Sequence, residues 1–329
     1  MASEQLFDRS QSSRASSICL WRFLDGKAGH RNQVFGLTDA LGRITSVDCQ
    51  DIDVSTALCG MKSLFPGRIR SLSSLRRPSL LIGAGHTTHI PLLAARHHFG
   101  GKATILMKPS LPLSLFDLCL IPAADNLKRI PHNVIITEGA VNRVQPGKTL
   151  SPQKGLVLVG GPSSHFGWSD EMVLNQIKSV IEGNPEIDWT LTTSRRTPLS
   201  FMSIWDRSGC AGRMLPVDQT NPDWLPTQLS SAGTVWVTND SVSMIYEALT
   251  SGAAVGVLTL PKTRKSRVTN GIDSLIARHL VTPFSSLQSP FILPRPCQQI
   301  DEANRCARLL ADRFFSQSTA DILQPKHAA

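Results

Sequence analysis

The chain has 329 residues, a net charge of +9 at pH 7 and 41% apolar residues. This content suffices for two hydrophobic cores of ordinary size, and the sequence holds no apolar run of about 18 residues that would span a membrane. Aromatic residues make up only 6% of the chain. Base-stacking surfaces are therefore disfavoured, and we expect no nucleic-acid partner despite the positive charge.

The amino terminus and the cysteines indicate the cellular compartment. Residues 1–17 are Ser-rich and charged and lack the apolar segment of a secretory signal, so we expect a disordered tail and a cytoplasmic protein. The seven cysteines are odd in number and form no Cys-x-x-Cys pair. We interpret them as reduced core residues rather than as disulfides or metal ligands.

The first strand and the loop after it provide the first candidate site. An apolar strand over 18–24 leads into the loop 25–30 and then into a helix with an apolar stripe. Such a loop lies at the carboxyl edge of a parallel sheet, where ligands bind. His30 is a candidate general base, and Asp25 would orient it or share that role. The alternative is a capping residue in a turn. The loop matches neither a dinucleotide motif nor a Walker A motif.

The same pattern recurs through the first half of the chain. A strand over 79–82, a Gly-rich turn and a helix over 90–96 are followed by strands over 103–107, 117–121 and 134–137. His86 and His89 have a spacing that a metal site could use, but no carboxylate or cysteine completes a ligand set, so we expect no metal.

A polar linker over 142–154 predicts a domain boundary. We place an N-terminal domain at 18–148 and a C-terminal domain, with the last helix, at 149–329. The second domain begins with a strand over 156–159, a Gly-Gly-Pro-Ser turn and a helix over 171–181. A strand over 189–191 then ends near Arg195 and Arg196, whose guanidinium groups suit phosphate oxygens. The alternative is an exposed basic turn.

The strand–helix–strand unit over 234–260 is the second candidate site. The Asn-Asp-Ser turn at 239–241 should cap a helix, and a helix N-terminus with Ser241 and Ser243 beside it suits a phosphate. Glu247, one turn later, would accept hydrogen bonds from sugar hydroxyls. The alternative is an ordinary capped helix with a solvated face.

Two later segments complete the sequence-based interpretation. The basic stretch 262–267 is a solvated loop or, if it has a role, a contact for an anionic membrane surface or a phosphorylated acceptor. The apolar helix over 299–315 must dock, and we expect it to cross back over both domains.

Four motifs together resemble a known family. They are residues 24–33 (LDGKAGHRNQ), 160–162 (GGP), 193–198 (TSRRTP) and 237–244 (VTNDSVSM) with Glu247 and Ala248. They are similar to motifs of the mitochondrial-fission family, which includes a plant elongated-mitochondria protein and bacterial relatives regarded as glycosyltransferases of the GT-B fold. The resemblance runs through residues 18–315. The loop at Gly29 and His30 also resembles the Gly-Gly-His loop of the lipid-linked GlcNAc transferase of peptidoglycan synthesis.

The resemblance implies an α/β fold of two Rossmann-like domains that face each other across a cleft. It implies a nucleotide-sugar donor (UDP-, GDP- or CMP-sugar) in the second domain and an acceptor glycan or glycolipid against the first. The expected donor-binding residues are Gly160, Gly161, Ser163, Ser194, Arg195, Arg196, Thr238, Asp240, Ser241, Ser243, Met244 and Glu247. The expected acceptor-side residues are Lys27, Gly29, Asn32, Gln33, Gly85 and His86.

Two departures from the family pattern bear on the acceptor side. Relatives tend to have an acidic residue and a histidine where this chain has Ala123 and Ala124, which argues against a catalytic part for that loop. The usual aspartate after Met107 is replaced by Lys108.

The sequence therefore predicts an inverting, metal-independent sugar transfer. His30 or Asp25 would deprotonate an acceptor hydroxyl, for example of a glycolipid or lipopolysaccharide precursor at the inner face of a membrane. A rival interpretation is a non-catalytic interaction protein of the fission type with a vestigial cleft. A dinucleotide-dependent epimerase is disfavoured because the chain lacks Gly-x-Gly-x-x-Gly and a Tyr-x-x-x-Lys pair.

Overall fold

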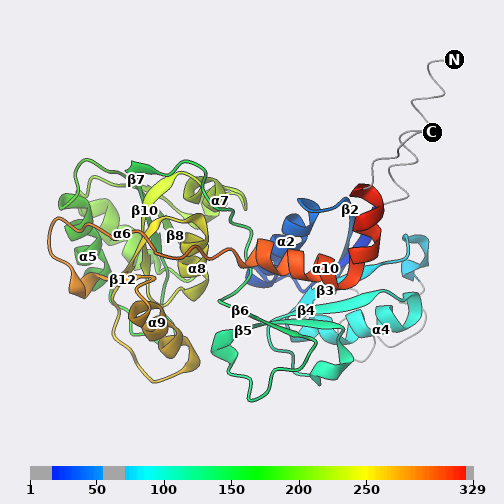
Figure 1. The fold of residues 1–329 in the computed structure, drawn as a ribbon. Coiled ribbons are helices and arrows are strands. Elements are labelled where there is room, and N and C mark those ends of the chain that lie inside the picture. Colours follow the sequence, from blue (N-terminus) through cyan, green and yellow to red (C-terminus); the bar gives the residue numbers. More distant parts are fainter. Residues whose placement is uncertain (1–16, 55–70, 324–329) are drawn as a thin grey trace, which may run out of the picture. The chain divides into compact units, whose positions relative to one another are not determined.

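The computed structural model describes residues 17–54 and 71–323 (Figure 1). The expected tail at 1–17 therefore lies outside the described residues except for Ser17. The chain divides into two compact units, which are described separately here: unit 1 contains residues 1–143 and 302–329, and unit 2 contains residues 144–301.

Unit 1 is built on a parallel six-stranded sheet in the order β2-β1-β3-β4-β5-β6. Its strands are β1 (Ile18–Leu24), β2 (Val47–Asp53), β3 (Leu80–Ala84), β4 (Lys102–Leu106), β5 (Leu118–Pro122) and β6 (Val134–Thr137). Its helices are α2 (Ala28–Gly42), α4 (His89–Phe99) and α10 (Glu302–Leu323), with 3-10 turns η2 (Ser71–Ser74), η3 (His86–Thr88), η4 (Leu113–Leu115) and η5 (Ala123–Asp125). β1 pairs with both β2 and β3, so the strand order reverses between β1 and β3. Ligands of open α/β sheets bind at such a switch point.

The last helix belongs to the first unit. Residues Cys306 and Leu310 of α10 are buried in the same core as Leu37 of α2, and Figure 1 shows α10 beside α2. The Arg305 guanidinium donates to the Ile136 carbonyl at 2.6 Å, which fastens α10 to β6. The sequence predicts a helix that crosses both domains, whereas α10 groups with unit 1. The range 149–329 expected for the second domain is thus too long at its carboxyl end, because the apolar face of α10 completes the core of unit 1.

Unit 2 has a second parallel six-stranded sheet, in the order β12-β11-β10-β7-β8-β9. Its strands are β7 (Ser151–Val159), β8 (Asp188–Thr193), β9 (Arg213–Leu215), β10 (Ala232–Thr238), β11 (Ala254–Leu258) and β12 (Thr282–Pro283). Its helices are α5 (Asp170–Glu182), α6 (Leu199–Arg207), α7 (Trp224–Leu229), α8 (Val242–Ser251) and α9 (Arg267–Ala277), with 3-10 turns η6 (Val217–Gln219) and η7 (Phe284–Ser286). The strand order reverses between β7 and β10, so the loops after these strands lie at the switch point of unit 2.

Burial of apolar side chains on both faces stabilises the central strands of each sheet. Central strands are covered on both faces, so β3 and β11 are buried at every position. No helix within the described residues is both long and apolar enough to cross a membrane.

Candidate functional site

An Asp–His pair lies at the switch point of unit 1. Asp25 directly follows β1, and His30 occupies the first turn of α2. Their side chains approach to 2.8 Å between Asp25 Oδ2 and His30 Nδ1. Thr87, in the loop after β3, donates its hydroxyl to the same carboxylate oxygen at 3.0 Å, and the backbone N–H of Lys27 donates to Oδ1 at 3.2 Å. The sequence prediction that Asp25 orients His30 is consistent with this geometry.

The hydrogen bonds to Asp25 define the state of the histidine. Burial alone would raise the pKa of the Asp25 carboxyl, but hydrogen bonds from His30, Lys27 and Thr87 outweigh it and lower that pKa below its usual value. An ionised carboxylate only accepts hydrogen bonds, so Nδ1 of His30 carries a proton, and in the neutral tautomer Nε2 is the nitrogen that can accept one. The Asp25 side chain is 3% exposed and that of His30 is 19% exposed, so the imidazole reaches solvent while the carboxylate does not.

Gly85 allows this pair to form. An added Cβ at Gly85 would lie 2.3 Å from His30 Cε1, and the backbone there has a φ of +86°, which glycine adopts without strain. Gly85 therefore belongs to the site through its missing side chain.

The other expected acceptor-side residues divide into two groups. Lys27, Gly29 and His86 are exposed at the carboxyl edge, beside the Asp–His pair. Asn32 and Gln33 are half-buried in α2, and the Asn32 side-chain oxygen accepts from the backbone N–H of Arg143 at 3.4 Å. Asn32 thus supports the segment that leaves unit 1 and is not presented with the other three.

His89 has a structural place in unit 1. It is 3% exposed, its ring packs edge-on against Phe116, and its Nδ1 lies 3.3 Å from the Ser110 hydroxyl. Burial, assisted by the nearby His86, lowers the pKa of His89 to about 4. No group of three or more His, Cys, Asp or Glu side chains with metal-binding geometry occurs within residues 17–54 and 71–323.

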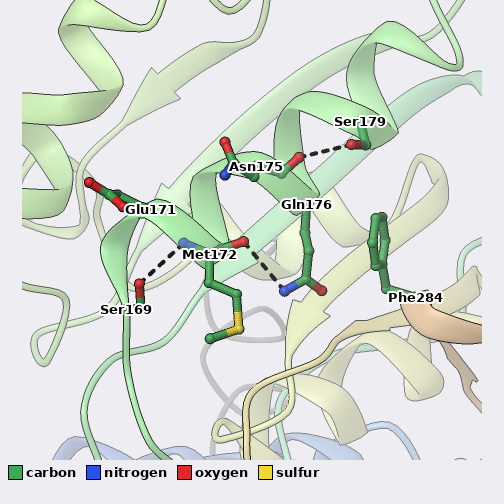
Figure 2. A pocket seen from close by; sticks show the side chains of 7 residues that line it. All are labelled: Ser169, Glu171, Met172, Asn175, Gln176, Ser179 and Phe284. Atoms are coloured by element: carbon green, nitrogen blue, oxygen red, sulfur yellow. Dashed lines mark hydrogen bonds between the residues drawn. The ribbon is translucent and has the colours of Figure 1, made fainter.

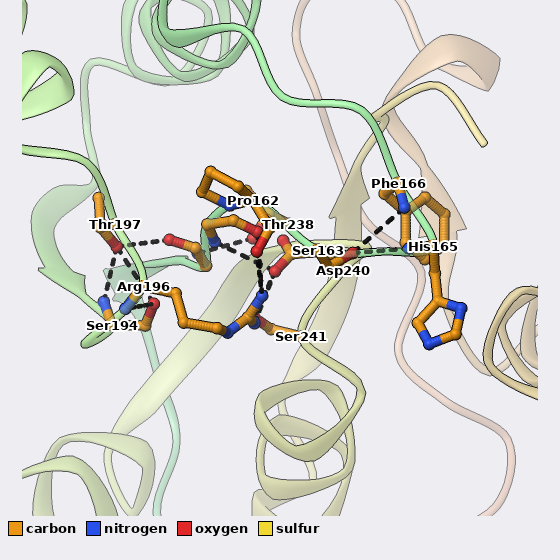
Figure 3. Close-up of polar contacts among 12 residues, drawn as sticks. Pro162, Ser163, His165, Phe166, Ser194, Arg196, Thr197, Thr238, Asp240 and Ser241 are labelled. Atoms are coloured by element: carbon orange, nitrogen blue, oxygen red, sulfur yellow. Dashed lines mark hydrogen bonds and ion pairs between the residues drawn. The ribbon is translucent and has the colours of Figure 1, made fainter. Parts of the chain in front are cut away.

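Three loops meet at the carboxyl edge of unit 2 (Figure 3). The Arg196 guanidinium, after β8, donates to Asp240 Oδ2 at 2.7 Å and to the Ser241 hydroxyl at 3.1 Å, both after β10. It also donates to the carbonyls of Gly161 and Pro162, after β7, at 3.0 and 3.1 Å. One arginine thus ties together the loops that follow three strands.

The Gly-Gly turn after β7 fits tightly into this arrangement. The Gly160 N–H donates to the Thr238 hydroxyl at 2.7 Å, and the Gly161 N–H donates to Asp240 at 3.1 Å. A Cβ at Gly160 would lie 2.3 Å from the Ser241 hydroxyl, and one at Gly161 would lie 2.2 Å from the Arg196 carbonyl. Both glycines are therefore required by close packing of the loops.

The two expected phosphate-binding arginines differ. Arg196 is engaged by Asp240, whose side chain is fully buried, so its charge is neutralised within the protein. Arg195 is exposed and has no ion pair with any residue that the structure describes. That both arginines serve a phosphate stays a prediction; the geometry shows that Arg196 is held by protein groups and that Arg195 is exposed.

The start of α8 also differs from the expected capped helix. Ser241 is the N-cap residue, but its side chain accepts no hydrogen bond from the first turn, because its hydroxyl faces Arg196 and Asp240. Among the described residues, no side chain caps the first N–H groups of α8. Ser243 is exposed in this turn, while Met244 and Glu247 are half-buried.

The remaining predicted hydroxyl groups shape the turns. Ser163 accepts from the N–H groups of His165 and Phe166, and Ser194 accepts from the N–H of Arg196. Sequence reasoning missed Thr197, which donates to the carbonyls of Val159 and Gly160, and it missed Thr87 in unit 1. Both threonines lie in polar turns that follow parallel strands, and this position is the sequence feature that could have marked them as site residues.

A separate groove of about 440 Å³ runs along α5 (Figure 2). Ser169, Glu171, Asn175 and Phe284 are among its lining residues. None of the predicted site residues lines it, so the groove is distinct from the edge of unit 2 that carries Arg195 and α8.

Solved structures from other organisms share this fold. A protein of Listeria monocytogenes assigned as a UDP-N-acetylglucosamine 2-epimerase superposes with a TM-score of 0.58 over 91% of this chain and 97% of its own, at 11% identity. The UGT2 protein of Phytolacca americana, solved with UDP-2-fluoro-glucose and pterostilbene, gives a TM-score of 0.50 over 93% of this chain and 92% of its own, at 11% identity. The fold is GT-B-like, as the sequence predicted.

Sequence comparisons lead to the family. The uncharacterized protein RP120 of Rickettsia prowazekii (strain Madrid E) is 21% identical over 321 residues, which covers 81% of this chain and 90% of RP120. The model of the mitochondrial fission ELM1 family matches residues 28–314, a range that includes His30, the Gly-Gly turn and α8. The chain therefore belongs to the mitochondrial fission ELM1 family.

Proposed function

We propose that this protein is a glycosyltransferase that moves a sugar from a nucleotide-sugar donor to an acceptor hydroxyl. In this proposal unit 2 binds the donor and unit 1 binds the acceptor. The observation that carries the proposal is the Asp25–His30 pair, which presents a free imidazole nitrogen at the switch point of unit 1.

His30 would act as the general base. A hydroxyl positioned at Nε2 loses its proton as its oxygen attacks the anomeric carbon of the donor, and the bond from that carbon to the phosphate oxygen breaks. Asp25 would hold the ring and stabilise the imidazolium that forms. This division of roles follows from the buried position of the carboxylate and the exposed position of the ring.

The departing phosphate needs positive charge and hydrogen-bond donors. The uncapped N–H groups at the start of α8 and the positive end of its dipole would bind it, with Arg195 as the exposed cation. Glu247, one turn along α8, would accept hydrogen bonds from the donor's hydroxyl groups. No metal is needed for these contacts.

Similarity in fold to an epimerase makes a second reaction worth testing. Lack of a dinucleotide motif disfavours only NAD-dependent epimerases, whereas the Listeria protein shares the present fold. An epimerase changes the sugar of a nucleotide sugar without an acceptor, and a transferase releases the nucleotide only when an acceptor is present. A fission-type interaction protein would bind no nucleotide sugar.

A thermal-shift screen of UDP-, GDP- and CMP-sugars would identify the donor. The stabilising compound is then incubated with candidate glycan and glycolipid acceptors, and nucleotide release is measured for the wild type and His30→Ala. We expect about 100-fold slower release by the variant. Near wild-type release by His30→Ala would remove His30 from its role, and a changed sugar without acceptor would favour epimerisation.

A further inference from the structure

Three neighbouring strands of unit 1 each lead to an exposed cationic or imidazole side chain at the carboxyl edge. Lys27 follows β1, His86 follows β3 and Lys108 follows β4, and all three residues are exposed. These strands are adjacent in the sheet order β1-β3-β4. The three residues therefore follow adjacent strands at the same sheet edge that carries Asp25 and His30.

No hydrogen bond or ion pair joins Lys27 Nζ or Lys108 Nζ to another described residue. Arginines elsewhere in the unit differ, since Arg96 pairs with Asp117 at 3.1 Å and Arg143 with Asp39 at 3.3 Å. The two lysines keep their charge available for a ligand.

The nearest carboxylate does not neutralise these lysines. Asp25 already accepts three hydrogen bonds and its side chain is 3% exposed. The other acidic groups of this edge flank the centre: Asp53 ends β2, Asp125 follows β5 and Glu138 follows β6. Asp25 thus leaves the charges of Lys27 and Lys108 unpaired by a described carboxylate at the centre of the edge, whereas Asp125 on the β5–β6 flank shares its loop with Lys128 and Arg129.

The spacing suits one small anion. Neighbouring strands lie about 4.8 Å apart, so the ends of β1 and β4 are separated by roughly 10 Å with β3 between them. Lysine ammonium groups on flexible four-carbon stems reach across such a distance to a shared phosphate or carboxylate.

We propose that the acceptor carries an anionic group, a phosphate or a carboxylate, which Lys27 and Lys108 hold beside the hydroxyl that His30 deprotonates. This inference rests on the proposed function, because it names the chemical class of the acceptor in that reaction. His86 adds a ring N–H donor above β3. A neutral sugar lacks the group that these side chains bind.

The test uses the full chain and three probes: glucose 1-phosphate, glucuronate and glucose. Binding is followed through the Cε1–H resonance of His30, which is identified by its loss in His30→Gln. We expect glucose 1-phosphate or glucuronate to shift this resonance at concentrations where glucose does not. The two anionic probes separate a phosphate site from a carboxylate site.

Variants locate the bound anion. Lys27→Gln and Lys108→Gln should each weaken binding about threefold, and the double variant about tenfold. Lys128→Gln removes an exposed lysine from the β5–β6 loop and should leave the affinity unchanged. Equal binding of glucose, or unchanged anion affinity in the double variant, would overturn the inference. So would loss of the shift in Arg195→Gln alone, because the anion would then bind to unit 2.

This readout is independent of sugar transfer. If the anions bind at Lys27 and Lys108 but no nucleotide sugar binds, the proposed function fails and only an anion site remains. If transfer is observed but neither anion binds, the inference about the acceptor fails and the proposed function stands.

Discussion

Each unit has an aspartate at its switch point, and the two aspartates bind different kinds of side chain, a histidine in unit 1 and an arginine in unit 2. Asp25 of unit 1 holds a histidine, whose other ring nitrogen has no hydrogen bond to any residue that the structure describes. Asp240 of unit 2 holds the guanidinium of Arg196, which stays charged and also binds two backbone carbonyls. The same kind of carboxylate therefore prepares a reactive group in one unit and fixes the shape of three loops in the other.

The first turn of α8 has no side-chain cap because its candidate capping groups bind Arg196. Because Asp240 and Ser241 bind Arg196, neither side chain caps the helix. The helix forgoes the stabilising contact of a side-chain cap, and its first N–H groups are the donors that we propose for the phosphate. Unit 1 makes a similar exchange at Gly85, where the absence of a side chain leaves room for His30.

Removing the negative charge of Asp25 should have the largest effect on the rate of sugar transfer. In Asp25→Asn the amide no longer fixes Nδ1 as the protonated nitrogen of His30, so we expect transfer to slow about 100- to 1000-fold. The free energy of unfolding should fall by about 1 to 2 kcal/mol, because the amide keeps one acceptor oxygen, whereas Lys27 and Thr87 donate to different oxygens of the carboxylate. Steady-state kinetics and urea unfolding measure the two quantities. An unaltered rate would contradict the assignment.

The second largest effect that we expect is a loss of stability of unit 1 at acidic pH. The folded-state pKa of His89 is about 4, below its unfolded value of about 6.5, so the unfolded chain binds more protons between these values. Stability of unit 1 should therefore fall as the pH drops from about 6.5 to 4, by up to about 3 kcal/mol. Asp25 acts in a lower window, since the stability from its lowered pKa is lost only as the pH falls below its unfolded value.

Hydrogen exchange of peptides from β3 and α4 reports on unit 1 alone. His89→Gln should flatten their pH dependence between pH 6.5 and 4, whereas His97→Gln, an exposed control on the same helix, should leave it intact. An equal slope in the wild type and His89→Gln would refute this account of acid sensitivity.

Breaking the contact between Asp240 and Arg196 should lower the free energy of unfolding of unit 2. Asp240→Asn removes the charge that neutralises Arg196 and weakens the link between three loops, so we expect a loss of about 2 to 3 kcal/mol in the free energy of unfolding. Part of the Arg196 side chain is exposed, which limits the loss. Arg195→Gln is the matched control and should change stability by less than about 0.5 kcal/mol. Tryptophan fluorescence in urea suits this test, because five of the six tryptophans belong to unit 2; equal stability of both variants would contradict the scaffold role of Asp240.

Substitution of Gly85, compared with Gly29 as its control, should give the smallest change in stability. Gly85→Ala places a methyl group against the His30 ring at a positive φ, so we expect a loss of about 1 to 2 kcal/mol and a slower transfer. Gly29→Ala, one residue from His30, meets nothing within 4 Å and should be neutral or slightly stabilising. Thermal unfolding compares them, and similar melting temperatures would show that the close approach at Gly85 is unimportant.

The sequence predicted the fold well wherever burial leaves a pattern. The bounds 18–24 and 134–137 match β1 and β6, and 171–181 lies within α5. β2 was missed because its sequence VDCQDID is mostly polar, as an edge strand permits, and only Ile52 is buried. α9 was missed because its start lies in the basic stretch 262–267, which obscured the Ser266 cap.

The candidate site was predictable only in part, since local spacing does not reveal distant partners. Asp25 and His30 are five residues apart, and their pairing followed from the sequence. Thr87 is 62 residues from Asp25, and Asp240 is 44 residues from Arg196. Neither contact has a local signal, so Arg196 was expected to bind phosphate rather than protein.

The central claim is that unit 2 holds a nucleotide sugar independently of the base in unit 1. Calorimetric titration of the stabilising nucleotide sugar into wild type, His30→Ala and Glu247→Ala tests it most directly. We predict the same Kd for wild type and His30→Ala, and weaker binding by Glu247→Ala. Absence of binding by every nucleotide sugar, or loss of binding in His30→Ala with full affinity in Glu247→Ala, would contradict the account.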